Sequence, residues 1–585
     1  SSDLLLTMQM AEKGLDAIYF EAGLRDWDAK GLESDLYLKA NDWVFINKED
    51  KTRYEGVSLG KLFTREVSLI HTSFARLTQA LDYFCNTYKP QKIYFFDYRS
   101  EVGILNDKAK LNLVADVCRI YGVALINRLD CPSNDENEFP QKNIYGNFIT
   151  NKNILVKTKD LLKGMLKEIY FNFWVYLSFL VNFSKPKNRK IIILTGGHLA
   201  NIIASKEFSN KNSASYFISV LNKSPLALLK IILLGGSLEK NFFVESREIN
   251  KEINKEKLKD IYETYTNHWN NNRYGVLEKI IFEHIRLNIF YSKRIENYCA
   301  QIETTKAFLE KKSPKKLLLD SVFGPDSRIA MELSNKLGIS VEYIWHGFWQ
   351  HIINFDALSG DKESSPLVRR VYSWGIQNDY WLDAIGWKGQ TLRVGNPFTQ
   401  KYKLSKQVKK NELKKRTTNI LVLQYTPMNT DVKGLNANQY GYLVDIVRIL
   451  NKKGGVSVRV KLHPGVWKKS YYERLAKMFK LDCEISDDGP FESHVQWADV
   501  VVGPAQSGAF LEVLAAKKYY YPVVMPPQSK MINVESGLVY FGLAELKNDL
   551  VNSVYHDQST MLEDLTSQTS IPDPLQALRD GLELE

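Results

Sequence analysis

A histidine stands where a predicted strand meets a turn, in the stretch RVKLHPG (459–465). The β-branched run VSVRV (456–460) predicts a strand that ends at His463, directly before Pro464. A strand end of this kind lies at the carboxyl edge of an open α/β sheet, where ligands bind. An imidazole there can donate a hydrogen bond to a phosphate oxygen and carry positive charge while the phosphate is bound. A structural histidine is the alternative, with Pro464 serving only to fix the turn and withdraw one backbone donor.

A second predicted strand end carries a helix N-terminus. The run ADVVV (498–502) predicts a strand, and Ser507 predicts the N-cap of a helix that continues past Glu512. The free amides and the dipole of a helix N-terminus bind phosphate, and Gly508 keeps this one open to a bulky anion. Glu512 is placed to reach the two hydroxyls of a ribose. The alternative is a capped amphipathic helix with a solvated glutamate.

The two strand ends belong to a chain with α/β organisation. Short apolar runs bounded by Gly or Pro and separated by helix-length segments predict βαβ units and parallel sheets. Two series of such runs predict two doubly wound, Rossmann-like domains. The first series is DWVFIN (42–47), KIYFFDYRS (92–100), VALINRLD (123–130), IIILTGGH (191–198), IILLGGS (231–237), KLLLDSVFG (316–324) and VEYIWHG (341–347); the second is NILVLQYTP (419–427), VSVRVKLHP (456–464), DVVVGPAQS (499–507) and YYYPVVMP (519–526).

Domain boundaries follow from these series and from one lysine-rich segment. We expect an N-terminal domain over 1–400, with a helical insertion at about 150–190. A linker at 401–418, rich in lysine, leads to a C-terminal domain over 419–545 and a helical tail over 546–585.

An aromatic-rich segment inside the insertion fits the α/β pattern poorly. Its apolar core, from Ile169 to Phe183, is shorter than the ~20 residues that span a bilayer. We expect a helix buried in the N-terminal half. A helix lying in a membrane interface, with Trp174 inserted, is the alternative, because aromatic rings and flanking lysines suit that location.

The composition of the chain limits the classes of binding partner that we expect. The 585 residues carry a formal net charge of +11, which suits nucleic acid, an anionic membrane or an anionic substrate. The sequence lacks zinc-finger spacing, an RNP-like strand and an Arg-rich arm, so we expect no nucleic-acid partner. Five cysteines without CxxC spacing (Cys85, Cys118, Cys131, Cys299 and Cys483) indicate reduced thiols in the cytoplasm. No signal peptide is recognisable.

The N-terminal half offers residues for the other side of a site. Two glycines and a histidine (Gly196, Gly197, His198) follow one predicted strand, and Asp320 and His346 follow two others. A general base needs a pKa near the working pH, which favours His346 over Asp320. Asp320 serves equally well as a simple helix cap. No DxD-type metal site follows a strand, so we expect metal-independent chemistry.

Five short motifs carry a resemblance to a known family. WHG (345–347), WG (374–375), VGNP (394–397), KLHP (461–464) and SGAFLEVL (507–514) occur in this order. They resemble GT-B glycosyltransferases of bacterial surface polysaccharides, over roughly 316–530. The sequence is similar to capsule Kdo transferases, to bacterial sialyltransferases with a His-Pro motif, and to teichoic-acid polyol-phosphate transferases.

The resemblance implies a function and residue roles. His463 and Ser507 would contact the donor phosphate, Glu512 the ribose and His346 would be the base, with Asn396 a further cleft residue. The sialyltransferases carry an acidic pair and a glycine before His-Pro, whereas DDG (487–489) follows it here.

By resemblance the donor is a cytidine-activated sugar, CMP-Kdo or a CMP-sialic-type sugar, and the acceptor a glycan or glycolipid. No cofactor is expected, and the tail should pack back on the N-terminal domain. The expected location is the cytoplasm or the inner face of the plasma membrane. The alternatives are a CDP-polyol phosphotransferase, a sugar-nucleotide epimerase and an inactive polysaccharide-binding scaffold.

Overall fold

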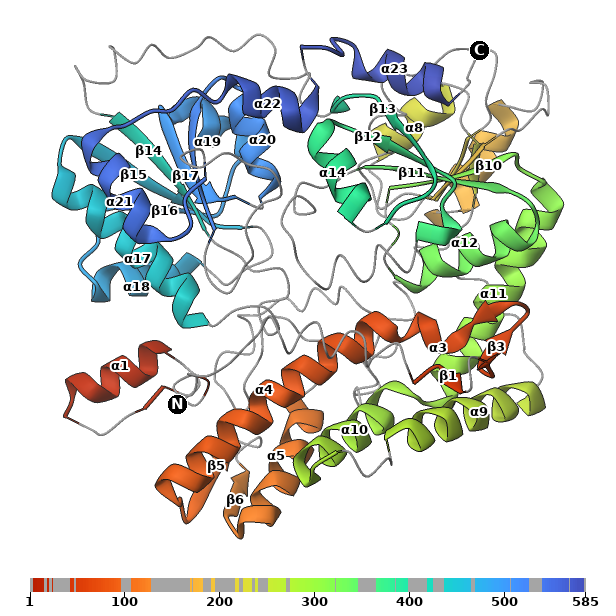
Figure 1. Cartoon of the computed structure of the whole chain (residues 1–585), viewed down its shortest axis with the longest axis horizontal. Coiled ribbons are helices and arrows are strands. Elements are labelled where there is room, and N and C mark those ends of the chain that lie inside the picture. The colour runs from red at the N-terminus through yellow and green to blue at the C-terminus, as the bar shows by residue number, and fades with distance from the viewer. Residues whose placement is uncertain are drawn as a thin grey trace.

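The computed structural model of the 585-residue chain is shown in Figure 1. It describes residues 4–14, 18–19, 24, 43–46, 49–95, 107–127, 169–170, 172–181, 191–194, 216–219, 225–233, 237–239, 251–269, 274–320, 322, 324–345, 365–384, 386–397, 418–424, 436–463, 469–505, 507–524, 539–567 and 569–582.

The C-terminal half forms a five-stranded sheet in which all strands run parallel, in the order β16-β15-β14-β17-β18. Val422 and Val502 face one apolar core, while Leu421 and Val501 face the other. Such burial on both faces is why these strands read as continuous apolar runs. The elements are β14 (Thr418–Leu423), α17 (Asn436–Lys453), β15 (Val456–Lys461), α18 (Lys469–Met478), β16 (Glu484–Ser486), α19 (Phe491–Trp497), β17 (Val500–Pro504), α20 (Gly508–Ala515), β18 (Tyr519–Val523) and α21 (Leu543–Asn552).

A second parallel sheet, with seven strands in the order β13-β12-β11-β10-β7-β8-β9, lies in the N-terminal half. The two sheets confirm the predicted pair of doubly wound α/β domains (Figure 1). The elements are β7 (Ile191–Leu194), β8 (Tyr216–Ser219), α8 (Pro225–Leu233), β9 (Ser237–Glu239), β10 (Lys316–Leu319), α12 (Pro325–Lys336), β11 (Ser340–Ile344), the 3-10 turn η3 (Ser365–Leu367), β12 (Arg370–Ser373), α14 (Ile376–Ala384) and β13 (Gln390–Arg393).

The first three predicted strands do not join this sheet, and the strand predicted at 231–237 is wrong as well, because residues 231–233 end helix α8 and β9 begins only at Ser237. Both findings correct the sequence interpretation. The run at 42–47 contributes to a short antiparallel pair, and the runs at 92–100 and 123–130 form a separate two-stranded parallel sheet. Long helices cover that small sheet and bury its inner face with Leu81 and Val117. The elements are α1 (Leu4–Glu12), β1 (Phe45–Ile46), β2 (Glu49–Asp50), β3 (Arg53–Tyr54), β4 (Val57–Ser58), α3 (Leu59–Leu62), α4 (Thr64–Tyr88), β5 (Lys92–Phe95), α5 (Asp107–Tyr121), β6 (Ala124–Asn127), α9 (Lys251–Trp269), α10 (Val276–Ile289) and α11 (Ser292–Lys312).

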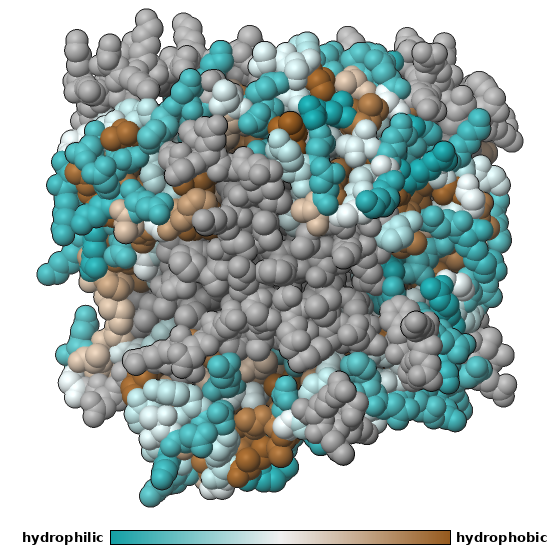
Figure 2. All heavy atoms as spheres, viewed as in Figure 1, coloured by the Kyte–Doolittle hydropathy of each residue, from teal (hydrophilic) through white to brown (hydrophobic). Residues whose placement is uncertain are grey.

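The reason for the correction lies in the packing of the long helices. Helices α4, α5 and α10 contact one another, so their apolar faces are already satisfied without the large sheet. Tyr94 in β5 is 50% exposed, so one face of this small sheet stays open to solvent. Over the described residues, the face of the molecule in Figure 2 is mainly hydrophilic, with hydrophobic side chains in small groups.

The C-terminal tail returns to the N-terminal sheet, as the resemblance implied. Helix α22 (Ser559–Thr566) contacts both α20 of the C-terminal half and α14 of the N-terminal half. Its residues Met561 and Leu565 belong to one apolar core that also contains residues of both sheets. Helix α23 (Pro574–Gly581) then packs Leu575 and Leu578 against the N-terminal sheet. The predicted linker falls outside the described residues, apart from Thr418 at the start of β14.

Two of the motifs quoted above, WG (374–375) and VGNP (394–397), contact the C-terminal tail. A Cβ atom on Gly375 would collide with the backbone of the tail at Asp564 and Leu565. Gly395 has φ +77°, a conformation that favours glycine, and lies against Thr566 and Pro574. The glycines of WG and VGNP therefore permit a close backbone contact in this structure.

Four of the cysteines fall within the described residues, and none of these four forms a disulfide. Burial raises the pKa of the Cys118 thiol to about 11 and of the Cys299 thiol to about 12. These two thiols are therefore protonated and poorly reactive near neutral pH, in line with the predicted reduced core thiols.

Replacing Gly375 with alanine should loosen the tail. The added methyl group meets backbone rather than a flexible side chain, so we expect a loss of about 1–3 kcal/mol and a lower melting temperature. Gly441→Ala is the matched control, because Gly441 lies inside α17 with no atom within 4 Å of its Cβ position. The control should raise stability slightly, by about 0.5–1 kcal/mol. Thermal unfolding of both variants measures this, and equal melting temperatures would contradict the account.

Candidate functional site

Three neighbouring strands of the C-terminal sheet end side by side. Strand β14 lies between β15 and β17, with Leu423 paired to Lys461 and Val422 paired to Val502. The chain runs from β14 to β15 and β16 on one side, and then to β17 and β18 on the other. The topological switch point therefore lies between β14 and β17, and ligands of open α/β sheets bind outside such a point.

The two predicted phosphate-binding elements both leave this edge. His463 follows β15 and Ser507 follows β17, so one intervening strand separates them. Strands in a sheet are about 4.8 Å apart, which puts the two strand ends roughly 10 Å from each other. At that separation His463 and the start of α20 can contact one phosphate-bearing ligand from opposite sides.

Gln424, at the end of the central strand, fixes the backbone of His463. The side chain of Gln424 is buried, and its Oε1 accepts the backbone N–H of His463 at 3.0 Å. Its Nε2 donates to the hydroxyl of Tyr472 on α18. The sequence interpretation missed this residue, although a polar side chain ends the apolar run NILVLQ at the same sheet edge.

The His463 side chain is exposed at the sheet edge. The pKa of its imidazole is nevertheless lowered from the usual value, because surrounding protein atoms displace part of its hydration. The ring is therefore neutral near pH 7 and gains charge readily when an anion approaches. Pro464 lies outside the described residues.

The helix N-terminus at Ser507 has the predicted geometry. Ser507 is the N-cap of α20, with extended backbone angles, and its Oγ accepts the N–H of Ala509 at 3.3 Å. Gly508 is exposed, and among the described residues no atom lies within 4 Å of its Cβ position. No acidic side chain occupies the first turn. The N–H groups of Ser507 and Phe510 donate to the carbonyls of Pro504 and Ser507, so among the described contacts the N–H of Gly508 is the one left for an anion at this end of the helix dipole.

The turn before Ser507 is held by the next strand. The hydroxyl of Tyr520 packs over Gly503, where a Cβ atom would collide with it, and donates to the carbonyl of Pro504 at 3.0 Å. The backbone of Tyr520 in turn exchanges two hydrogen bonds with the Gln558 side chain, at 3.1 and 2.7 Å. The tail that contains Gln558 therefore supports the strand beside the site.

Glu512 is half-buried on α20, five residues beyond Ser507. At 1.5 Å per residue this is a rise of about 7 Å along the helix. Such a spacing is compatible with a phosphate at the helix start and a ribose further along.

The acidic triplet DDG lies beside the histidine in space, although it follows it in sequence. Strand β16 pairs with β15 through Ser486 and Lys461, so Asp488 leaves the sheet next to His463. The hydroxyl of Ser486 donates to Asp488 at 3.0 Å and lowers the pKa of that carboxyl. Lys461 Nζ donates to the carbonyl of Asp488 at 3.1 Å. The triplet forms a turn, as expected, and it brings negative charge to this end of the edge.

Part of the N-terminal candidate set lies outside the described residues. This applies to Gly196, Gly197, His198 and His346, whose roles stay predictions. The strands before them are described: β7 and β11 flank β10, with Leu319 paired to both Leu194 and Tyr343. The three strand ends thus share one edge, at the switch point between β7 and β10.

Two other N-terminal candidates are described and buried. Asp320, directly after β10, is 3% exposed. Asn396 is 2% exposed, and its backbone N–H donates to the carbonyl of Thr566 at 3.1 Å. Asn396 therefore lies under the returning tail, and its role as a cleft residue stays a prediction.

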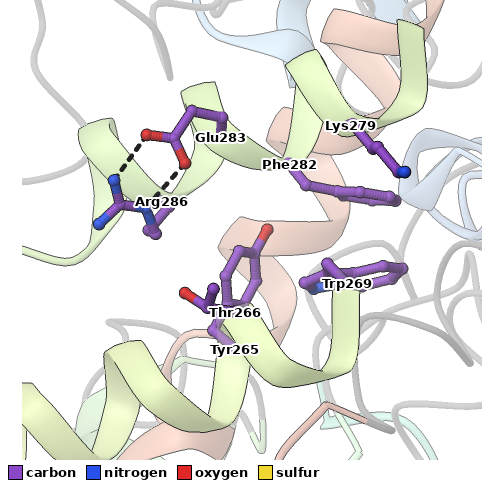
Figure 3. A pocket seen from close by; sticks show the side chains of 7 residues that line it. All are labelled: Tyr265, Thr266, Trp269, Lys279, Phe282, Glu283 and Arg286. Atoms are coloured by element: carbon purple, nitrogen blue, oxygen red, sulfur yellow. Dashed lines mark hydrogen bonds and ion pairs between the residues drawn. The ribbon is translucent and has the colours of Figure 1, made fainter. Parts of the chain in front are cut away.

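A small cavity lies between helices α9 and α10 in the N-terminal half (Figure 3). Its volume is about 50 Å³, and it is lined by Tyr265, Thr266, Trp269, Lys279, Phe282, Glu283 and Arg286. The rings of Trp269 and Phe282 stack at 3.7 Å. Within the described residues, the Tyr265 hydroxyl and Trp269 Nε1 are buried without a hydrogen-bond partner. The size suits a few water molecules, which buried donors of this kind bind, and excludes a nucleotide sugar.

No metal centre emerges from the described part of the chain. Within it, no three His, Cys, Asp or Glu side chains are grouped so that they could hold an ion.

The chain was also compared with known families, curated proteins and solved structures. No family model and no curated protein matches the chain. Among solved structures, MurG from Acinetobacter baumannii is similar at 10% identity and a TM-score of 0.36, covering 68% of this chain and 99% of that one. UDP-GlcNAc 2-epimerase from Methanocaldococcus jannaschii is similar at 12% and 0.39, covering 67% and 99%. The wall teichoic acid polymerase TagF is similar at 10% and 0.35, covering 74% and 98%.

Likenesses at this level carry no argument about activity. The class of the molecule rests on its own topology: two doubly wound parallel α/β sheets, with a tail that returns from the second to the first. This is the GT-B type of architecture that the sequence predicts.

Removing the amide of Gln424 should free the backbone at His463. Gln424→Ala leaves the His463 N–H without its acceptor, so deuterium uptake in a peptide covering 459–463 should rise. Tyr472→Phe is the matched control, because it removes only the hydroxyl at the far end of the amide. Unchanged uptake in Gln424→Ala would show that this hydrogen bond does not hold the strand end.

Proposed function

We propose that this chain is a GT-B glycosyltransferase of bacterial capsule or lipopolysaccharide synthesis. It transfers a sugar from a cytidine-activated donor, CMP-Kdo or a CMP-sialic-type sugar, to a glycan or glycolipid acceptor. It acts in the cytoplasm, at the inner face of the plasma membrane. The observation that carries the proposal is that His463 and the open N-terminus of α20 leave the same edge of one parallel sheet, on the two sides of β14.

Each element has a role in the reaction. The bond between the anomeric carbon and the phosphate oxygen breaks, and the acceptor oxygen forms the new bond. Negative charge then develops on the departing CMP phosphate, where the N–H of Gly508, the dipole of α20 and the His463 ring stabilise it. Glu512 accepts hydrogen bonds from the ribose. No metal or cofactor takes part in this scheme.

The proton of the acceptor hydroxyl must go to a base. We assign it to His346, which follows β11, because an imidazole titrates near neutral pH without burial. Asp320 is the competing candidate, but it is buried at the end of β10. Full turnover by His346→Ala would remove His346 from this role.

Nucleotide binding tests the donor site. We expect CMP, among CMP, CDP, UDP and GDP, to raise the melting temperature most. His463→Ala should lower kcat/KM by about 10²-fold or more, because a charge-assisted hydrogen bond to the leaving group is lost. Glu512→Ala should weaken the binding of CMP through the ribose.

His556→Ala is the matched control for this test, since His556 pairs with Asp549 in the tail region. It should bind CMP as the wild type does. Wild-type turnover by His463→Ala would remove His463 from the site.

The same nucleotide panel separates the alternatives. Preference for CDP favours a polyol phosphotransferase, and preference for UDP favours a sugar-nucleotide epimerase. No shift with any nucleotide favours an inactive polysaccharide-binding scaffold.

Phosphate binding should also be linked to protonation of His463. The pKa of the free ring is lowered, and a bound phosphate raises it, so binding takes up a proton between the two values. Affinity for CMP should therefore increase as the pH falls from about 8 towards 6. Calorimetry in two buffers of different ionisation enthalpy measures the uptake. The difference between wild type and His463→Ala cancels the titration of CMP itself, and equal uptake by both proteins would contradict the contact.

A further inference from the structure

The aromatic helix, formed by residues 169–170 and 172–181, has an inner face that packs on the N-terminal half. Trp174 is 8% exposed and shares an apolar core with Leu228 and Leu238. The hydroxyl of Ser178 accepts the backbone N–H of Leu238 at 2.9 Å. At this residue the helix is buried in the N-terminal half as expected, and the alternative in which Trp174 inserts into a membrane is wrong, because Trp174 anchors the helix to the protein.

The outer face of the same helix is apolar and open to solvent. Ile169, Phe173, Tyr176 and Leu180 are 63%, 57%, 63% and 52% exposed. Their spacing of four, three and four residues places them on one side of a helix. The helix therefore carries an apolar stripe that the described residues leave open to solvent.

Helix α8 likewise has an inner face that packs on the protein and an outer apolar face that is exposed. Leu228 and Ile232 point into the core that contains Trp174, whereas Leu226 and Leu233 are 65% and 66% exposed. Helix α8 and the aromatic helix are thus anchored in one apolar core. Of the 18 exposed large hydrophobic residues among the described ones, nine lie on these two helices: Ile169, Phe173, Tyr176, Phe179, Leu180, Val181, Leu226, Leu229 and Leu233. Such concentration marks an interaction surface rather than scattered exposure.

The charge pattern identifies the partner. Among the described residues of the two helices, Lys230 is the only charged one. In the sequence, four of the six residues at 185–190 are basic and none is acidic. Aromatic and aliphatic side chains next to basic residues suit the boundary between acyl chains and anionic headgroups. No helix in the described part of the chain has the length and apolarity to cross a bilayer.

We propose that the outer faces of the aromatic helix and α8 together form a surface that lies in the interface of an anionic membrane. The proposal deepens the location given under the proposed function. It rests on exposed side chains and charge, so a failure of the donor assignment leaves it intact.

Vesicle flotation of the full chain tests the surface. The wild type should float with vesicles of phosphatidylcholine and phosphatidylglycerol, and less with phosphatidylcholine alone. Phe173→Glu combined with Leu233→Glu should reduce the partition coefficient at least about tenfold, because two apolar side chains no longer enter the interface. At high salt, attraction between charges is screened, so binding that the wild type retains there is due to insertion of apolar side chains into the membrane interface.

Leu287→Glu combined with Val276→Glu is the matched control, with the same change in charge at residues of α10 that are 57% and 65% exposed. The control should float as the wild type does, and circular dichroism should show all three proteins folded. Equal flotation of the first variant and the wild type would overturn the proposal. Absence of vesicle binding by the wild type would overturn it as well. In that case, a dimer seen by sedimentation and disrupted only by the first variant would show that the surface binds a second copy of the chain instead.

Discussion

Parallel pairing of β15, β14 and β17 is the constraint on which the candidate site depends. Because the three strands run in one direction, every loop that follows them leaves at the same edge. The chain then diverges between β14 and β17, the kind of switch point at which open α/β sheets bind ligands, with His463 leaving the edge on one side and α20 on the other. The amide of Gln424 fixes the depth at which His463 leaves the sheet.

The C-terminal tail connects this sheet with the N-terminal half of the molecule. Gln558 completes the outer edge of β18 next to the site, and the following helix packs between α20 and α14. Residues from both sheets therefore share one apolar core with Met561 and Leu565. The packing of this tail therefore links the two halves in one apolar core. The glycines of WG and VGNP serve that packing.

How much the sequence predicts depends on whether a feature is local. The helix cap at Ser507 and the strand before His463 follow from residue types within a few positions, and both are confirmed. The contact of Gln424 with His463 joins residues 39 positions apart, so only the strand order reveals it. The position of DDG beside His463 depends on the pairing of β15 with β16 for the same reason. The apolar run of β5 predicts a strand of the large N-terminal sheet. Because α4, α5 and α10 pack against one another, β5 lies in a separate small sheet instead.

A double-mutant cycle on CMP binding tests the central claim most directly, that His463 and the N-terminus of α20 hold one phosphate. Calorimetry would compare the wild type, His463→Ala, Gly508→Pro and the double variant, since proline at the first position of α20 removes the N–H of Gly508, for which the described residues provide no acceptor, without adding charge. Two groups on the same phosphate should be coupled by at least about 0.5 kcal/mol. Effects that add within about 0.3 kcal/mol, or single variants that bind CMP like the wild type, would contradict a shared phosphate site.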